Sequence, residues 1–216
     1  MDREAFLAGI RGRRARQAQE PGPRRAVERV AGGEPGAAML ERWREVGGTG
    51  ELARAADAPA RVTAALRDRG VRCVRLWDHE EVRRLDLAAA LAAAGLEVLR
   101  GEEGLTAELE GTWRAQAGVV VASAGVASTG TMALVAGPGC PRATSLLPPT
   151  LVILCREPDI VDRMSLLWER LPLSGPRPPS NIALVTGPSS SADIESHLIR
   201  GVHGPGDVIA LVLAAG

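Results

Sequence analysis

The stretch ARVTAALRDRGVRCVRLWDHEEVRRLDLAAALAAAGLEVL, residues 60–99, decides the fold class of this sequence. It predicts a helix over Ala60–Arg69 that leads through Gly70 into the apolar strand VRCVRLW. A second helix, over Leu85–Ala94, leads through Gly95 into the strand LEVL. Helices that alternate with short, continuously apolar strands are typical of a parallel sheet with both faces covered. The pattern therefore predicts an α/β fold, with a mostly parallel sheet and helices on both of its faces.

The same alternation continues toward the C-terminus. A helix over Leu105–Ala115 leads through Gly118 into the strand VVVA, and the runs LVILC and VIALVL predict two further buried strands. The glycine-interrupted run Val126–Ala136 is strand-like, and Asp159–Leu171 has a helical pattern. We predict that the Pro-rich connector Leu173–Ser180 is a loop, because too little chain follows it to form a separate core.

The N-terminal part has a weaker pattern. Residues 2–19 predict a helix that stops at Pro21, and Ala37–Val46 predicts another one. We therefore divide the chain into an N-terminal helical extension over residues 1–50, packed on the domain, and an α/β domain over residues 51–216.

Composition excludes several kinds of function. The 216 residues include 26 basic and 26 acidic ones, so the net charge is zero and a general nucleic-acid binder is not expected. Every basic residue is an arginine and tyrosine is absent, which rules out a Schiff-base lysine, a P-loop lysine and a tyrosine acid. No apolar stretch is long enough to span a bilayer, and the N-terminus lacks a signal-peptide core. We therefore expect a cytoplasmic protein without a membrane partner.

The cysteines do not have the spacing of metal ligands. Cys73, Cys140 and Cys155 lie far apart, and two of them stand in apolar runs. Reduced thiols buried in strands are the favoured interpretation. Because the chain also lacks G-x-G-x-x-G after a strand, we predict no metal site and no bound flavin, nicotinamide or metal cluster.

Three segments in the C-terminal half have residues that can carry chemistry. The first is Ser128-Thr129-Gly130-Thr131, where small hydroxyl residues around a glycine let a ligand approach the backbone closely. A bulge or a tight turn between strands is the favoured alternative for this segment.

The second segment is IALVTGPSSSADIE, over Ile182–Glu195. An apolar strand runs through Gly187 into a serine-rich loop, and Ser190-x-x-Asp193 has the form of a capping box at a helix start. A helix start reached from a strand is where open α/β sheets place anionic ligands. Capping of the helix alone explains the pattern equally well.

The third segment is GVHGP, which places His203 between glycines before the last strand. An imidazole suits acid–base work, although a lone histidine is more often structural. We predict that the three segments meet in one crevice at one end of the sheet, with two catalytic residues: Asp193 accepts a ligand hydroxyl and His203 is the titrating group. The predicted binding residues for a small carboxylate or phosphate are Ser128, Thr129, Gly130, Thr131, Gly187, Ser189, Ser190 and Ser191. The alternative, in which Asp193 caps its own helix and His203 bonds a turn, stays open.

Three motifs overlap these segments: TGTMALVAGPGCPRATSLLPP at Thr129–Pro149, TGPSSSADIE at Thr186–Glu195 and GVHGP at Gly201–Pro205. Their order and spacing make the chain resemble the LUD-domain (lactate utilisation) family, specifically the small third subunit of the bacterial L-lactate oxidation system. The resemblance implies a fold like that of ribose-phosphate isomerases, glucosamine-phosphate deaminases and CoA transferases. It also implies a part in oxidising L-lactate to pyruvate, as a non-cluster component beside two partner proteins that carry the iron–sulfur clusters.

The sequence departs from that family's pattern at four polar positions. Ser123 and Ser128 stand where the family usually has an Asp and a Glu, Leu151 where it has a His, and Ser190 where it has an Arg. Serine cannot act as a carboxylate base at neutral pH, and leucine cannot titrate. These differences favour a non-cluster component of the system, or a scaffold or regulatory protein that keeps the fold without the site. A stand-alone enzyme on a sugar-phosphate or CoA substrate is the third alternative and rests on fold analogy alone.

Overall fold

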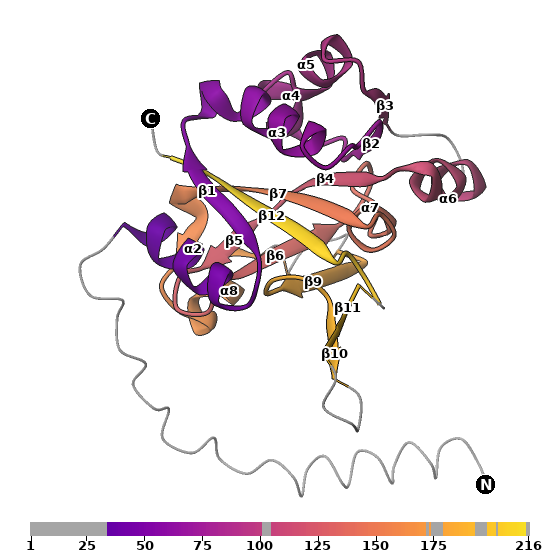
Figure 1. The fold of residues 1–216 in the computed structure, drawn as a ribbon. Helices are drawn as coiled ribbons and strands as arrows, with labels where there is room; N and C mark the ends of the chain where they lie inside the picture. The colour runs from indigo at the N-terminus through magenta and orange to yellow at the C-terminus, as the bar shows by residue number, and fades with distance from the viewer. Residues whose placement is uncertain are drawn as a thin grey trace, which may run out of the picture.

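The computed structural model describes residues 34–100, 105–171, 173, 179–192, 198–201 and 203–214. A six-stranded parallel sheet crosses the centre of the molecule (Figure 1), with the strand order β1-β12-β7-β4-β2-β3. In that order the strands are β1 (Thr49–Ala53), β12 (Asp207–Leu213), β7 (Thr150–Arg156), β4 (Ala117–Val121), β2 (Cys73–Leu76) and β3 (Glu97–Leu99). The predicted α/β class with a mostly parallel sheet is confirmed.

The interiors of β12, β7 and β4 are apolar because both faces of these strands are buried. In β7, Val152 and Leu154 pack into the core on one face of the sheet. Leu151, Ile153 and Cys155 of the same strand pack into the core on the other face. Successive side chains of a strand point to opposite faces, so a strand covered on both sides has no polar position to alternate with.

Helices cover the first face of the sheet, above it in Figure 1: α3 (Ala58–Arg67), α4 (Glu80–Arg84) and α5 (Leu87–Ala93). Gly70 follows α3 with a φ of 67°, and Gly95 follows α5 with a φ of 84°. A glycine in this left-handed conformation ends a helix without the strain that a Cβ atom would cause. The helix–glycine–strand units predicted around Gly70 and Gly95 are therefore present. Helix α5 corresponds to the predicted helix Leu85–Ala94, and α4, which precedes it, was not predicted.

The other face carries a helix and a second sheet. Met39 and Trp43 of α2 (Pro35–Glu45) pack in one core with Met132 and Leu134. The second sheet has the order β8-β5-β6-β9, with strands β8 (Ile160–Val161), β5 (Ala124–Val126), β6 (Thr131–Ala136) and β9 (Asn181–Val185). Helices thus lie on both faces as predicted, but the sequence did not predict the second sheet.

The second sheet explains two differences from the predicted elements. The run predicted as one strand over Val126–Ala136 turns back on itself, so that β5 and β6 pair antiparallel; Gly130 in the turn has a φ of 65°. The run predicted as a helix over Asp159–Leu171 instead begins with β8, which pairs with β5, and only then forms α8 (Met164–Arg170). A 3-10 turn, Glu157–Asp159, joins β7 to β8.

Gly118 lies inside β4 rather than before it. A Cβ atom at this position would overlap the carbonyl oxygen of Thr144 in α7 (Ala143–Leu146). The glycine therefore allows α7 to pack directly on the strand. The neighbouring helix α6 (Leu105–Arg114) lies beside α7 at the same end of the sheet (Figure 1).

The predicted helix start at Ser190 is wrong. Residues Ser190–Ala192 form strand β10, which pairs antiparallel with β11 (Leu198–Arg200). The Ser190 hydroxyl donates to the carbonyl of Pro188 at 3.0 Å, so it does not cap a helix. The small hydroxyl residues of this segment serve a strand and a turn, and the oriented N–H groups of a helix N-terminus are absent from Ser190–Ala192.

The predicted domain boundary falls inside β1, since that strand spans Thr49–Ala53. The predicted helix over residues 2–19 and most of the extension lie outside the described residues. Helix α2, which belongs to the predicted extension, packs on the sheet. In the part of the chain that the structure describes, no helix is long and apolar enough to cross a membrane.

Candidate functional site

The three segments singled out in the sequence touch one another. A chain of hydroxyl groups joins the first two: the Oγ1 atoms of Thr129 and Thr131 lie 2.8 Å apart, and those of Thr131 and Thr186 also lie 2.8 Å apart. Two backbone bonds join the second and third: the Ser189 N–H donates to the Pro205 carbonyl at 2.9 Å, and the Gly201 N–H donates to the Ser189 carbonyl at 2.9 Å. We call these three segments the amino-end cluster, because the third one leads directly into the amino end of β12 in the central sheet.

Two glycines of the amino-end cluster are packed under the end of α2. A Cβ atom on Gly130 would lie 2.7 Å from the backbone nitrogen of Trp43, and one on Gly187 would lie 2.6 Å from a methyl carbon of Val46. Both glycines have a positive φ, 65° and 79°. Their backbones therefore meet the protein itself at the positions where the sequence predicted an approaching ligand.

The remaining predicted residues lie in different surroundings. Asp193 is outside the described residues. Ser128 is half-buried, and its N–H donates to the carbonyl of Asp162 at 3.1 Å. His203 is exposed and lines a groove of about 650 Å³ beside Trp113, whose exposed fraction is 78%. The structure therefore brings the segments together, and the role predicted for Asp193 and His203 stays a prediction.

A different group of side chains lies at the carboxyl ends of the parallel strands. His79 follows β2, Ser123 follows β4, and Arg156 ends β7. Open α/β sheets bind ligands outside the carboxyl ends of their strands. Two cavities meet here, and both are lined by His79, Val121 and Ser123. We call this group the carboxyl-end site.

The two cavities differ in character. The larger one, about 510 Å³, is mostly apolar and is lined by Trp77, His79, Val121, Ser123, Val135, Ala136, Gly137, Pro138, Cys140, Pro179 and Ser180. The smaller one, about 220 Å³, is mostly charged and is lined by His79, Glu80, Glu81, Arg84, Val121, Ala122, Ser123, Arg156 and Asp159. An apolar pocket with a few convergent polar groups is typical of ligand sites.

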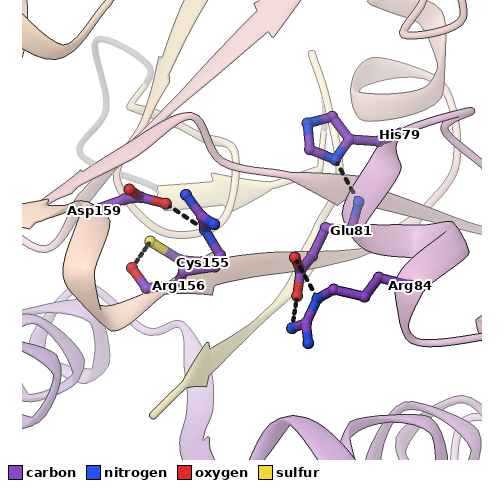
Figure 2. Close-up of polar contacts among 6 residues, drawn as sticks. All are labelled: His79, Glu81, Arg84, Cys155, Arg156 and Asp159. Carbon is purple, nitrogen blue, oxygen red and sulfur yellow. Dashed lines mark hydrogen bonds and ion pairs between the residues drawn. The ribbon is translucent and has the colours of Figure 1, made fainter. Parts of the chain in front are cut away.

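His79 is held in one orientation by the start of α4. Its Nδ1 atom accepts a hydrogen bond from the Glu81 N–H at 3.1 Å (Figure 2), so the ring proton is assigned to Nε2. Burial lowers the pKa of His79 below its usual 6.5, which keeps the ring neutral at pH 7. Within the described residues, Nε2 has no hydrogen-bond acceptor. His79 is therefore a neutral N–H donor at the junction of the two cavities.

Ion pairs fill the wall of the charged cavity. The Glu81 carboxylate is buried and bonds the Nε and a terminal nitrogen of Arg84, and Arg156 Nε donates to Asp159 at 2.7 Å (Figure 2). The hydrogen bond to Glu81 raises the pKa of Arg84, and that to Asp159 raises the pKa of Arg156. To the described residues, Arg156 donates a side-chain hydrogen bond only from Nε. Its two terminal nitrogens are therefore available to bind an anion.

Trp77 and Cys140 form part of the apolar cavity. Trp77 donates from Nε1 to the carbonyl of Pro141 at 2.9 Å, which fixes the loop between β6 and α7. Cys140 is half-buried, and burial raises the pKa of its thiol to about 11. The group is therefore a thiol at neutral pH and a poor nucleophile. The other free cysteines, Cys73 and Cys155, are buried in strands.

His79 was not among the site residues predicted from the sequence, and Ser123 stood there only as a departure from the family pattern. A usable signal was present: the polar residues Asp78 and His79 come directly after the apolar strand VRCVRLW, at its carboxyl end. No described group of three or more His, Cys, Asp or Glu residues is placed to hold a metal ion.

The sequence is similar to a known protein family and to several bacterial proteins. The family model described as LUD domain matches residues 38–213. A "Lactate utilization protein C" of Halalkalibacterium halodurans is 36% identical over 143 residues, which are 65% of this chain and 62% of that protein. An uncharacterized protein of Neisseria meningitidis is 33% identical over 142 residues, 63% of this chain and 57% of that protein. These matches span about three fifths of the relatives' length.

A solved structure shares the fold. The crystal structure of a DUF162 family protein from Deinococcus radiodurans aligns with a TM-score of 0.62, covering 83% of this chain and 96% of that one, at 23% identity. At that identity the likeness concerns the fold alone.

Proposed function

This chain belongs to the LUD domain family, and from that premise we propose that it works in lactate utilisation, as the non-cluster component of a system that oxidises L-lactate to pyruvate. The observation that carries the proposal is the match, over most of the chain, to relatives named for lactate utilisation. The motifs noted in the sequence, Thr129–Pro149 and Gly201–Pro205, support the same assignment.

The carboxyl-end site is the region best suited to a small 2-hydroxy or 2-oxo acid. His79 Nε2 and the Ser123 hydroxyl can donate to a carboxylate or carbonyl oxygen, and both line the two cavities. The terminal nitrogens of Arg156 can hold a carboxylate, which a guanidinium binds with charge-assisted hydrogen bonds. Because Arg84 and Arg156 are already paired with Glu81 and Asp159, binding of such an acid is expected to be weak.

The amino-end cluster is the second candidate for this ligand. Its threonine hydroxyl chain and the groove beside His203 favour it. In that case Asp193 would accept the ligand hydroxyl, and His203 would titrate.

One pair of matched variants separates the two candidates. Calorimetry with L-lactate, pyruvate and phosphate is carried out on the unmodified chain, on His79→Gln and on His203→Gln. The carboxyl-end site predicts that His79→Gln loses binding and that His203→Gln keeps it. The reverse result, together with loss in Asp193→Asn, would move the ligand to the amino-end cluster. An unmodified chain that binds none of the three anions would support the scaffold alternative.

The partners follow from the same resemblance. We expect two proteins with iron–sulfur clusters to bind this chain. Co-purification of the tagged chain with the products of adjacent cysteine-rich genes tests the assignment. Recovery of both in fixed proportion supports it, and recovery of the chain free of both contradicts it.

A further inference from the structure

The apolar cavity of the carboxyl-end site is larger than a three-carbon acid requires. Its volume, about 510 Å³, lies within the range of roughly 300–1,000 Å³ that holds drug-sized ligands. L-lactate bound in the charged cavity, or at His79 itself, would leave most of this space unfilled. The cavity therefore has room for a ligand that the lactate proposal does not account for.

The walls of the cavity indicate what such a ligand looks like. Six apolar residues contribute most of the lining: Trp77, Val121, Val135, Ala136, Pro138 and Pro179. The charged groups of the site, on Arg84, Glu81, Arg156 and Asp159, line the neighbouring cavity instead. An uncharged apolar body fits the larger cavity, because no Asp, Glu or Arg side chain among the described residues lines it to pair with a buried charge.

The two polar side chains that line both cavities limit the chemistry further. His79 presents an N–H and Ser123 a hydroxyl, and both face the two cavities. A neutral N–H beside a hydroxyl donates well to a carbonyl or carboxylate oxygen. An oxygen bound there would place the rest of its molecule in the apolar cavity.

We propose that the carboxyl-end site binds an acyl compound longer than lactate, with its carbonyl or carboxylate oxygen on His79 Nε2 and the Ser123 hydroxyl, and its hydrocarbon body against Trp77, Val135 and Ala136. The inference shares His79 with the proposed function but does not require the chain to take part in lactate oxidation. It concerns binding and includes no chemical step.

A homologous series tests the size of the body. Calorimetry on the unmodified chain compares pyruvate, 2-oxobutyrate, 2-oxohexanoate and 2-oxooctanoate. Each buried methylene should tighten the dissociation constant about fourfold until the cavity is filled. A dissociation constant that does not change along the series overturns the inference. If the long acids bind and pyruvate does not, the inference is supported and the proposal that this site binds a lactate-sized acid is contradicted. If pyruvate binds and the longer acids bind no more tightly, the inference is contradicted and the proposal for lactate is supported.

Cys140 reports on the cavity independently. It lines the apolar cavity and is half-buried, whereas Cys73 and Cys155 are buried. Maleimide modification at pH 8.5, followed by intact mass, should therefore occur at Cys140, and Cys140→Ser identifies that signal. A saturating concentration of 2-oxooctanoate should slow the modification at least threefold, whereas pyruvate should slow it less. Equal rates with and without the long acid contradict the inference.

A change to the wall gives the third test. A Cβ atom on Gly137, which lines the cavity, would meet no atom within 4 Å, so Gly137→Val should fold normally. The added side chain should reduce affinity for 2-oxooctanoate about tenfold and leave that for pyruvate unchanged. Gly137→Ala, with one carbon only, is the matched control and should have a smaller effect. Unchanged affinity for the long acid in both variants counts against the proposed position of its body.

Discussion

Both ends of the central sheet carry polar side chains, but at the amino end these bond one another and at the carboxyl end they line cavities. At the amino end, the hydroxyls of Thr129, Thr131 and Thr186 bond one another, and Gly130 is packed against α2. At the carboxyl end, His79 Nε2 and the Ser123 hydroxyl lie beside cavities with no acceptor among the described residues. Motifs rich in Gly, Ser and Thr can therefore serve packing, while donors beside a cavity identify the better candidate for ligand binding.

The largest effect that separates the two ends is expected from glycine substitutions. Gly130→Ala should lower the free energy of unfolding by roughly 2–4 kcal/mol, because the new Cβ would lie 2.7 Å from the Trp43 nitrogen and the φ is positive. Gly137→Ala at the carboxyl end, where the Cβ meets open space, should change it by less than about 0.5 kcal/mol. Urea unfolding of both variants measures the difference, and equal losses would contradict the packing role of the amino end.

The hydroxyl chain should give the next largest effect. Thr131→Val keeps the shape of a buried side chain but removes the central hydroxyl, and should cost about 1 kcal/mol. Thr129→Val is the matched control. Thr129 is exposed and stands at one end of the row of three hydroxyls, so its substitution should lower the free energy of unfolding by less. Chemical denaturation compares them; a larger loss in Thr129→Val would mean that the chain of bonds is not organised around Thr131.

A pH dependence at the carboxyl end is expected to be smaller again. Because burial lowers the pKa of His79 in the folded chain, the unfolded chain takes up its proton first as the pH falls. The stabilising contribution is therefore complete above pH 6.5 and is lost as the pH falls through the folded pKa. His79→Gln should show a shallower loss of stability between pH 7.5 and pH 5 than the unmodified chain. Parallel pH profiles of the two proteins would be inconsistent with a neutral, half-buried His79.

The smallest effect concerns Ser123. Ser123→Ala should weaken binding of any acid that the chain binds by roughly two- to tenfold, the usual value of one hydrogen bond, and leave the thermal midpoint nearly unchanged. Calorimetry and a thermal melt on the same preparation check both parts. A Ser180→Ala variant, which removes another hydroxyl lining the same cavity but not the proposed oxygen donor, should bind as the unmodified chain does.

Helices and strands whose limits are set by neighbouring residues could be predicted from the sequence. Gly70 and Gly95 each end a helix and precede a strand, and continuous apolar runs such as LVILC mark strands buried on both faces. The second sheet was not predictable in the same way, because its pairing joins Met132 to Val185, far apart in the chain. Ser190 had the form of a helix cap, but its hydroxyl bonds the nearby Pro188 carbonyl and its backbone pairs with Arg200, a strand pairing that the capping pattern does not reveal.

The candidate site was less accessible to sequence reasoning than the fold. A short run of serines and glycines indicates a turn and a ligand loop equally, since both need small residues and freedom of φ. The one signal for His79 in the sequence is its place directly after an apolar strand, and a single histidine there forms no motif. Only the meeting of β2, β4 and β7 places it beside Ser123 and Arg156.

The central claim is that ligand binding belongs to the carboxyl end of the sheet. A crystal structure of the chain grown with 2-oxooctanoate tests it most directly, because it shows the position of the acid. We predict electron density for its oxygens at His79 Nε2 and Ser123 and for its chain against Trp77. Density beside His203 and the Ser189–Ser191 segment instead, with the carboxyl-end cavities holding only water, would contradict the account.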